Sequence, residues 1–341
     1  MKDLKQEFNR LRKEQINFIA VSNAEWYSLL KDEIRNSIAI EGVFANRNEL
    51  LDVLERKKRT NDEKTAAILG YYESASTCYE YANNLYKENE FQLRLSDLRQ
   101  IHTLLMRYEK QAGTYDGDLG DFRKEDVAVT QSSFTPLKGE FVHETMQKYV
   151  EWINHHLTLD EPDCVRFVAA AHVLFETIHP FNNDNGRVGR ILLSYLLIGC
   201  GYVNIAIKGT NKPEREKYYA ALEIGDNCFN AMLREIESGA LPGIELIDAC
   251  LDKSELSNME AIIRERLSNS FDRLKRKELQ AFNRDAELPL RDAALFFEYS
   301  PDYLRQLIHD GKIKASKKGK LWYVTIREVE KYMSRQETLF E

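Results

Sequence analysis

Two apolar helical stretches that enclose a short polar loop constrain this chain more than any other feature. The first reads VRFVAAAHVLFETI over residues 165–178, and the second reads ILLSYLLI over residues 191–198. Such stretches are typical of helices buried on most sides. Residues 179–190, HPFNNDNGRVGR, therefore predict a polar loop that leads into the start of a buried helix. Because the first N–H groups of a helix are unpaired and its dipole favours negative charge, we expect this loop to bind an anion.

The side chains of the loop fit that chemistry. Arg187 and Arg190 carry guanidinium groups, which donate paired hydrogen bonds to phosphate. Gly186 has no Cβ, so a phosphate can approach the backbone closely. His179 stands at the loop entrance, where an imidazole can accept the proton of an incoming hydroxyl group. The pattern predicts a site that combines phosphate binding with proton transfer.

This run of residues resembles the signature of the Fic family, which reads H-P-F-x-(D/E)-G-N-G-R-x-x-R. Family members transfer a nucleotide-derived phosphoryl group, usually AMP from ATP, to a protein hydroxyl group. The resemblance implies that His179 is the general base and that Asn185 and Gly186 are donors on the α-phosphate side. It also implies that Arg187 binds the β-phosphate and Arg190 the γ-phosphate of ATP, with Mg²⁺ as the cofactor.

The loop departs from that signature at two positions. Asn183 stands where the family has the acid that coordinates Mg²⁺, and Asp184 stands where it has a glycine. An amide oxygen is neutral, so it should hold Mg²⁺ more weakly than a carboxylate does. Asp184 would supply the missing charge if the loop turns it inward, and Asp tolerates positive φ better than most residues. A shifted metal ligand, a weakened metal site and altered chemistry stay open, since a toxin branch with Asn at this position transfers phosphate instead of AMP.

A second motif lies far upstream. Residues 37–42, SIAIEG, read as the last turn of a helix followed by a glycine, with Ser37 and Glu41 on one helical face. The stretch resembles the inhibitory pattern of the Fic family, (S/T)-x-x-x-E-(G/N), with Gly42 in its last position. The resemblance implies that Glu41 pairs with Arg190 in place of the γ-phosphate, so that the enzyme is autoinhibited. The same glutamate has an AMP-removing role in some relatives, which leaves that reaction open.

Composition and charge limit the class of protein. With 43% hydrophobic and 30% charged residues, the chain resembles an ordinary globular protein rather than a disordered one, and its net charge of −7 gives no global nucleic-acid signal. Five scattered cysteines without C-x-x-C spacing are typical of reduced thiols. Residues 1–15 lack the apolar stretch of a secretory signal, and residues 191–207 are too short and interrupted for a membrane span. We therefore expect a cytoplasmic, bacterial protein without membrane contact.

The fold class is predicted to be mainly α, because glycine and proline are scarce and long amphipathic stretches dominate. The expected domains are an N-terminal helical region with the inhibitory helix (1–90), a Fic core (91–205), a helical extension or linker (206–284) and a winged helix-turn-helix (285–341). Residues 120–129 and the following SSFTP turn resemble the family's flap, a short β-hairpin that binds a target peptide; an ordinary surface hairpin is the alternative. Tyr218 or Tyr219, in a helix that resembles the one beside the adenine pocket, would stack on the base unless both belong to the core.

The C-terminal segment has the pattern of a winged helix-turn-helix. RDAALFFE and DYLRQLIHDGK read as two short helices at a tight turn, with Ser300 as the N-cap and Pro301 as the first residue of the second helix. Residues 313–315 and 321–324 then predict a two-stranded wing. The segment resembles excisionase- and MerR-like DNA-binding domains, and dimerisation or docking of a partner protein is the alternative.

A local basic patch supports contact with DNA. Residues 303–320 hold six Lys or Arg residues against a single acid. Such a patch is what phosphate contacts require on a chain of negative net charge. We expect Arg305 and Gln306 to lie near the bases, and the wing lysines Lys317, Lys318 and Lys320 to contact phosphates.

The sequence therefore predicts a protein adenylyltransferase that transfers AMP from ATP to a Ser, Thr or Tyr hydroxyl of itself or of a target protein. A Fic-type phosphotransferase and an AMP-removing hydrolase are the alternatives among enzymes. A DNA-binding regulator whose core only senses nucleotide is the alternative from another class, and Asn183 favours it. The target protein, any DNA sequence and the oligomeric state, including a homodimer, stay open.

Overall fold

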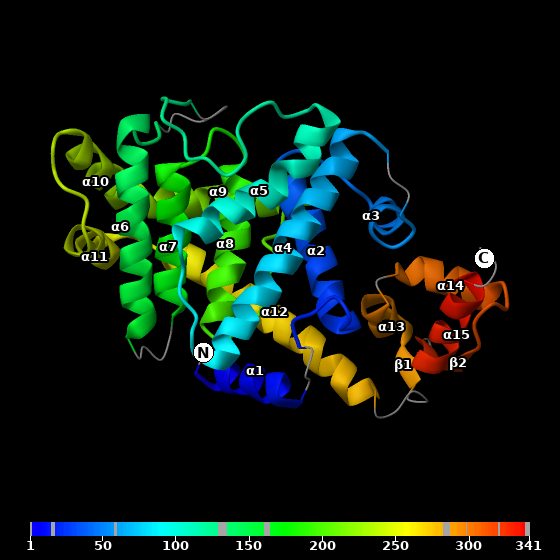
Figure 1. The fold of residues 1–341 in the computed structure, drawn as a ribbon. Helices are drawn as coiled ribbons and strands as arrows, with labels where there is room; N and C mark the ends of the chain where they lie inside the picture. Colours follow the sequence, from blue (N-terminus) through cyan, green and yellow to red (C-terminus); the bar gives the residue numbers. More distant parts are fainter. Residues whose placement is uncertain are drawn as a thin grey trace. The chain divides into compact units, whose positions relative to one another are not determined.

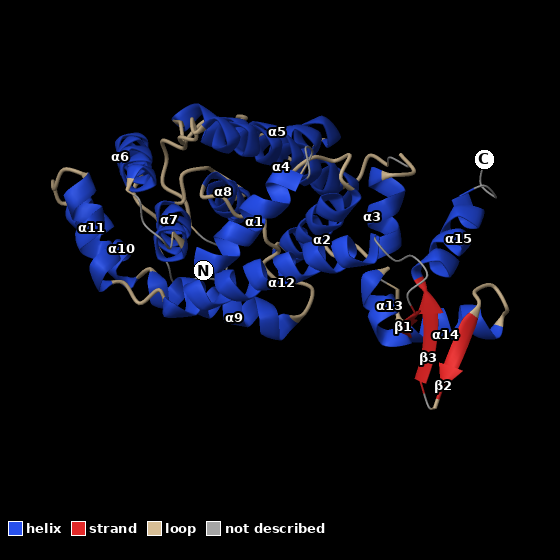
Figure 2. Ribbon diagram, turned by 90° about the horizontal axis from the view of Figure 1, so that it is seen from below, coloured by secondary structure: helices blue, strands red, loops and turns tan. Residues whose placement is uncertain are grey.

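The computed structural model describes residues 2–14, 18–57, 60–128, 135–159, 164–281, 287–297, 299–319 and 321–337. The chain divides into two compact units, residues 1–271 and 272–341. Within the described residues the first unit is built from helices, whereas the three strands belong to the second unit (Figures 1 and 2). The mainly helical fold class is thus confirmed, while the finer domain boundaries expected from the sequence stay a prediction.

The first unit contains eleven of the described helices, and a twelfth continues into the second unit. They are α1 (Lys2–Glu14), α2 (Ala24–Ile40), α3 (Arg47–Leu54), α4 (Glu63–Glu88), α5 (Leu95–Ala112), α6 (Gly139–Thr158), α7 (Val165–Ile178), α8 (Asn185–Gly199), α9 (Lys212–Gly225), α10 (Asn227–Glu237), α11 (Ile244–Lys253) and α12 (Ser257–Ala281).

The centre of the first unit is α8. All of its residues except Gly186 are buried, as expected for a helix whose residues 191–199 are apolar or aromatic except for Ser194. It packs against α7 on one side and α4 on the other, as Figure 1 shows. Helices α4 and α5 approach so closely that a Cβ on Gly70 would lie 1.9 Å from the carbonyl oxygen of Leu105. After α8 the chain turns at Gly201, where φ is +92°, as expected for a core helix followed by a turn.

A buried polar network fixes α2 against α4 and α8. The carboxylate of Glu33 accepts hydrogen bonds from the hydroxyl groups of Tyr71 (3.0 Å) and Tyr79 (2.5 Å) on α4. It also accepts from Ser194 on α8 (3.3 Å) and from the amide of Asn204 (2.8 Å). Burial raises the pKa of Glu33 to about 7, although these four donors oppose the shift. The helix that carries the predicted inhibitory motif is therefore anchored in the core.

The end of α2 has the geometry that the sequence predicted. Gly42 has φ +86°, a left-handed conformation that favours glycine. Its N–H donates to the carbonyl of Ala39 at 3.2 Å, and the Val43 N–H donates to that of Ile38 at 3.0 Å. This turn ends the helix directly after Glu41.

The second unit is a small helical domain with one sheet. Its elements are β1 (Glu287–Pro289), α13 (Leu290–Phe296), α14 (Pro301–His309), β2 (Ala315–Lys318), β3 (Leu321–Thr325) and α15 (Ile326–Glu337). Ser300 caps α14 by accepting from the Tyr303 N–H at 3.0 Å, which confirms the predicted start of that helix. Buried apolar residues from both α13 and α14, together with Ile313 and Val324, form its core.

The wing differs from the two-stranded prediction. The sheet has three antiparallel strands in the order β1-β3-β2, because Leu288 in the additional strand pairs with Val324. Pro289 suits β1, since an edge strand tolerates the missing N–H of a proline. The predicted strand at residues 313–315 is wrong except at its last residue: β2 starts at Ala315, and Ile313 is buried in the core instead.

The region of the predicted flap is only partly described. Residues 121–128 and 135–138 form neither helix nor strand. Residues 129–134, which include most of the SSFTP turn, lie outside the described residues, so the β-hairpin flap stays a prediction. Among the described residues, no helix combines the length and the apolar character that crossing a bilayer requires.

Candidate active site

The polar loop predicted from the sequence connects α7 to α8. Helix α7 ends at Ile178, and the next residue, His179, has a left-handed backbone (φ 55°, ψ 60°) and an N–H that donates to the carbonyl of Phe175 at 3.0 Å. Asn185 holds the loop through Phe181, accepting from its N–H and donating to its carbonyl, both at 2.8 Å. The buried Phe181 ring stacks on His102, with ring centroids 4.2 Å apart. The loop conformation is therefore set by core contacts and internal hydrogen bonds.

The start of α8 has the features of an anion site. Asp184 precedes the helix with φ 64° and ψ 22°, so it adopts the left-handed conformation for which the Fic signature has a glycine. No side chain caps the helix, which leaves the N–H groups of Asn185, Gly186 and Arg187 without an intrahelical acceptor. Since the Asn185 side chain is committed to the loop, its backbone N–H is the group that can meet a phosphate.

Arg190 and Glu41 form the ion pair that the sequence motifs predict. The Arg190 Nη2 lies 2.6 Å from the Glu41 Oε1, and Arg190 also donates to Ser37, from Nε to the hydroxyl group at 2.7 Å and from Nη2 to the carbonyl at 3.2 Å. The Arg190 side chain is 3% exposed and that of Glu41 is 35% exposed. Burial lowers the pKa of Arg190, but Glu41 together with Tyr218, Tyr71 and Glu176 holds the pKa above its ordinary value. The inhibitory role of the pair stays a prediction.

The Glu41 carboxylate also reaches the start of α8. A Cβ placed on Gly186 would lie 2.5 Å from the Glu41 Oε1 and 3.1 Å from Arg190 Nη1. A negatively charged oxygen therefore lies against the helix N-terminus, beside one of the two arginines. A phosphate that binds the same N–H groups has to compete with this carboxylate.

Arg187 is paired with carboxylates as well. Its Nη1 donates to the Glu109 Oε1 and its Nε to the Asp184 Oδ1, both at 2.5 Å. The side chain is 6% exposed; burial alone would lower its pKa, but the two carboxylates raise it above the ordinary value. The Asp184 contact depends on the departure from the Fic signature, because a glycine at that position has no carboxylate.

His179 has the protonation state of a general base. Its Nδ1 lies 3.3 Å from the carbonyl oxygen of Glu176, which can only accept, so Nδ1 carries the hydrogen and Nε2 keeps its lone pair. Burial lowers the pKa of His179 to about 4; the Arg123 charge lowers it further, while the Glu176 carbonyl and the Glu41 charge oppose the shift. The imidazole is therefore neutral near pH 7.

The proposed metal ligands are adjacent oxygen donors. Asn183 is exposed at the loop, and the Asp184 carboxylate lies beside Arg187. Burial raises the pKa of Asp184; the Arg187 charge opposes the shift, and the charges of Glu109 and Glu41 add to it, so a further cation would favour the ionised carboxylate. Within the described ranges, no group of three or more His, Cys, Asp or Glu residues is arranged to hold a metal alone. The two residues fit Mg²⁺ as part of a set that nucleotide phosphates and water complete.

The two tyrosines proposed for the adenine site differ in burial. Tyr218 is 1% exposed, its hydroxyl group lies 2.8 Å from the His172 Nε2, and the Arg190 guanidinium lies 6.0 Å from its ring centroid. It is a core residue that supports Arg190, which corrects the prediction that it stacks on the base, since neither face of its ring is open. Tyr219 is 47% exposed and donates to the carbonyl of Ile40 at 3.2 Å, so it stays the candidate.

Two charged residues of the site were not identified from the sequence. Glu109 continues the buried face of α5 formed by Leu98 and Leu105, and an acid on an apolar helix face is the signal that would have pointed to it. Arg123, 2% exposed, donates from Nε to the His179 carbonyl at 2.7 Å. It lies in a stretch that was assigned only to the flap, and nothing local in its sequence indicates burial.

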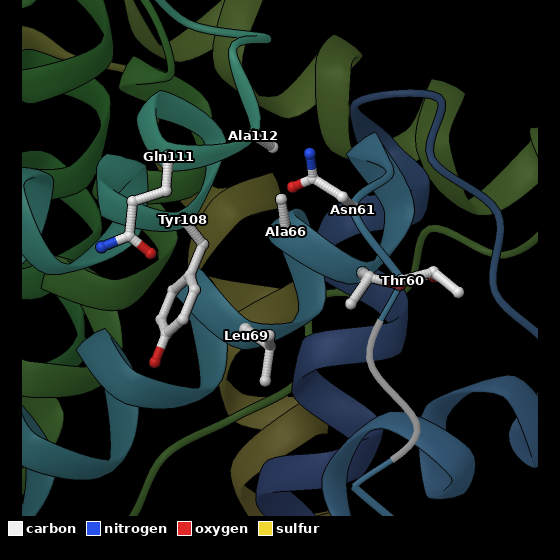
Figure 3. A pocket seen from close by; sticks show the side chains of 8 residues that line it. Thr60, Asn61, Ala66, Leu69, Tyr108, Gln111 and Ala112 are labelled. Atoms are coloured by element: carbon white, nitrogen blue, oxygen red, sulfur yellow. Dashed lines mark hydrogen bonds between the residues drawn. The ribbon is translucent and has the colours of Figure 1, made fainter.

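A pocket of about 300 Å³ lies elsewhere, between the start of α4 and the end of α5 (Figure 3). Neither the loop nor the inhibitory turn contributes to its walls, so it is distinct from the phosphate site. Its lining residues are Thr60, Asn61, Thr65, Ala66, Leu69, Tyr108, Gln111 and Ala112.

The residues proposed for DNA contact lie on the second unit. Arg305 and Gln306 are exposed on α14, while Lys317 and Lys318 are exposed on β2. Arg305 and Lys318 each pair with a neighbouring carboxylate, at 2.6 Å and 2.5 Å. Lys320 lies outside the described residues.

Comparisons with known proteins agree with this arrangement. The Fic/DOC family matches residues 92–197, and a helix-turn-helix domain matches residues 288–337. A probable protein adenylyltransferase of Aquifex aeolicus is 29% identical over 310 residues, which cover 89% of this chain and 87% of that protein. The protein adenylyltransferase Fic of Culex quinquefasciatus is 30% identical over 198 residues, which cover 57% of this chain but only 36% of that protein.

Solved structures show the same fold. Fic-1 of Caenorhabditis elegans (residues 134–508) superposes with a TM-score of 0.57 at 19% identity, covering 82% of this chain and 71% of that one. A Fic-domain signaling protein of Bacteroides thetaiotaomicron superposes with a TM-score of 0.56 at 17% identity, covering 80% and 97%. At these identities the likeness concerns the fold alone.

Proposed function

Because residues 92–197 belong to the Fic/DOC family and residues 288–337 to a helix-turn-helix family, we propose that this chain is a protein adenylyltransferase with a DNA-binding domain. It transfers AMP from ATP to a Ser, Thr or Tyr hydroxyl group of itself or of a target protein. One observation carries the proposal: an uncapped start of α8 with two buried arginines lies directly after a left-handed, neutral histidine.

The proposed reaction begins with proton transfer to His179. Its Nε2 takes the proton of the target hydroxyl group while the hydroxyl oxygen attacks the α-phosphorus of ATP. A bond forms between that oxygen and phosphorus, the bond from phosphorus to the bridging oxygen breaks, and pyrophosphate leaves. The N–H groups of Asn185 and Gly186 and the guanidinium groups of Arg187 and Arg190 stabilise the charge on the phosphates.

Mg²⁺ is part of this proposal. Asn183 and Asp184 would hold it, and when bound the ion neutralises phosphate charge. Asp184 then has two competing partners, because its carboxylate also accepts from Arg187. A weak metal requirement or a high Mg²⁺ concentration for activity is the expected consequence of the neutral Asn183.

Autoinhibition by Glu41 follows from the same geometry. Its carboxylate lies where the start of α8 and Arg190 would receive a γ-phosphate. Ser37 holds the Arg190 guanidinium from the same helix, and Gly42 ends that helix. ATP binds productively only when the Glu41 side chain leaves this position.

Two other reactions have an observation in their favour. A phosphotransferase is favoured by Asn183, since the acid of the Fic signature is absent there. Removal of AMP from a modified protein is favoured by Glu41, whose carboxylate lies beside Gly186 at the start of α8. A cytoplasmic, bacterial setting belongs to the main proposal and rests on the cysteine spacing and the likeness to the Aquifex protein.

Intact-protein mass spectrometry tests the reaction. The full chain and its Glu41→Gly variant are incubated with ATP and Mg²⁺, with Glu41→Gly/His179→Ala as the inactive control. A gain of one AMP unit that the control lacks is expected. A gain of phosphate would support the phosphotransferase, loss of AMP from modified protein would support the hydrolase, and no change in any sample contradicts the proposal.

A further inference from the structure

Arg123 is a buried cation whose partners are backbone carbonyl groups. Its side chain is 2% exposed, and within the described residues it forms no salt bridge. Nε donates to the carbonyl of His179 at 2.7 Å, and Nη2 donates to that of Ile178 at 3.1 Å and to that of Leu137. Nη1 donates to the carbonyl of Glu125 at 2.9 Å. Burial lowers the pKa of Arg123, and the nearby charge of Asp126 opposes the shift without forming a salt bridge.

These contacts fall on the end of α7, where the loop begins. The last carbonyl groups of a helix have no intrahelical partner, so they need other donors when they are buried. The Arg123 side chain supplies donors to residues 178 and 179, and its backbone N–H donates to the carbonyl of Pro180 at 2.9 Å. Three consecutive carbonyl groups are thus held by one residue, across the turn where His179 is left-handed. Such a conformation is unfavourable for a residue other than glycine and needs surrounding contacts to persist.

Arg123 also places a positive charge beside the His179 imidazole. The charges that act on this ring come from two segments: Arg123 from the segment before α6, and Glu41 from the end of α2. Glu176 lies three residues before His179 on α7. Arg123 disfavours the protonated ring and Glu41 favours it. The Glu176 carbonyl accepts from Nδ1, and burial raises the pKa of the Glu176 carboxyl group to about 7, so that group is only partly ionised at neutral pH.

We propose that Arg123 is the positioning residue of the general base: it holds His179 in its left-handed conformation and places a positive charge beside the imidazole. The inference rests on the proposed transferase function for its kinetic consequence, but the protonation of His179 can be measured without any reaction. Arg123 contacts none of the residues proposed to bind the phosphates, so its loss should lower kcat and leave the KM for ATP unchanged.

Two variants separate the two roles. Arg123→Lys keeps the charge but loses the planar group that reaches several carbonyls at once. Arg123→Met keeps much of the volume and loses both. Arg99→Lys is the matched control, because Arg99 lies beside the same segment, paired with Asp121 at 3.1 Å and stacked over Phe122, without reaching the loop. All three are made in the Glu41→Gly protein.

NMR titration of the histidine rings gives the first readout. The seven histidines are compared with those of a His179→Gln protein to assign the signal, and His172, with a pKa lowered to about 3 by burial, serves as an internal reference. The pKa of His179 is expected to rise towards its ordinary value in Arg123→Met by roughly one unit, and to stay low in Arg123→Lys. An unchanged His179 pKa in Arg123→Met overturns the electrostatic part.

Steady-state kinetics gives the second readout. In Arg123→Lys we expect kcat to fall roughly tenfold or more from misplacement of the base, with the KM for ATP unchanged and Arg99→Lys like the parent. Normal kcat in Arg123→Lys overturns the positioning role, and this variant decides the question if Arg123→Met fails to fold. Absence of any AMP transfer in the parent refutes the proposed function instead, and the titration still tests Arg123.

Discussion

Replacing Glu41 with glycine should release the nucleotide site. Glu41 is the first residue after α2, and its carboxylate is bonded to Arg190 and lies against Gly186. The variant removes the only carboxylate that the described residues place on Arg190, while Ser37 keeps the guanidinium in position. ATP should therefore bind more tightly and AMP transfer should increase.

The size of the effect follows from the geometry of the pair. A hydrogen bond between charged groups contributes about 1.5–3 kcal/mol. Because Glu41 is 35% exposed, solvent screening weakens the hydrogen bond between Glu41 and Arg190, and we take its contribution as about 1–2 kcal/mol. At 1.4 kcal/mol per factor of ten, the affinity for ATP should rise roughly 5- to 30-fold. Glu41→Gly also removes the repulsion between Glu41 and the γ-phosphate, so this rise in ATP affinity is a lower bound.

Calorimetric titration of ATP measures this affinity, with the proteins in a His179→Ala background so that no nucleotide is consumed. Glu41→Gln is the informative companion, because it keeps the shape of the side chain and removes its charge. Glu55→Gly is the matched control: Glu55 also follows a helix directly and pairs with a cation, Lys31, at 2.6 Å, but it does not contact Arg190.

Two results would refute the reasoning. One is a Glu41→Gly protein that binds ATP no more tightly than the parent and the Glu55→Gly control. The other is a Glu41→Gly/Arg190→Ala protein that retains the full gain, because the freed guanidinium is the source of the added affinity. Equal affinity of Glu41→Gln and the parent would show that steric occupancy, rather than charge, excludes the phosphate.

The remaining predictions concern single steps of the proposed function. His179→Ala should abolish transfer yet bind ATP, as mass spectrometry and calorimetry can check, and near-normal transfer would contradict its role. Because the pKa of His179 is lowered to about 4, the base stays neutral above that value, so the rate should fall with acid only as the pH approaches 4; a midpoint near 6.5 in the pH–rate profile would argue against this. Asn183→Asp should tighten Mg²⁺ binding and raise AMP transfer, which a titration with no gain would count against. Measured without Mg²⁺, Asp184→Gly should free one donor group of Arg187 and raise the affinity for ATP by about 1–2 kcal/mol, or roughly 5- to 30-fold; unchanged affinity would mean that Glu109 alone controls this arginine. Alanine replacement of the three wing lysines should weaken DNA binding and reduce its salt dependence by roughly one unit of slope per contact, and a full-length chain that shifts no DNA at low salt would point to docking of a protein instead.

Local sequence rules predicted the helix ends of the site well. The left-handed glycine at Gly42 and the serine cap before α14 depend on residues within one turn of each other. The left-handed Asp184 was foreseen for the same reason, since its backbone conformation is set by the loop it occupies. Prediction failed for β1, because a three-residue edge strand that contains Pro289 has too short a pattern to recognise and forms only by pairing with β3.

The order of residues alone showed which chemical groups stand in the loop and that buried helices flank it. Through resemblance to a family, it also predicted that Glu41 would meet Arg190 across 149 residues. Which other charges meet depends on the tertiary structure. Glu109 reaches Arg187 from 78 residues away, Arg123 reaches the His179 carbonyl from 56 residues away, and Tyr218 turns into the core. Caps and turns follow from steric and hydrogen-bonding rules that extend over a few residues, whereas burial, ion pairing and the pKa of a buried histidine depend on what packing brings together.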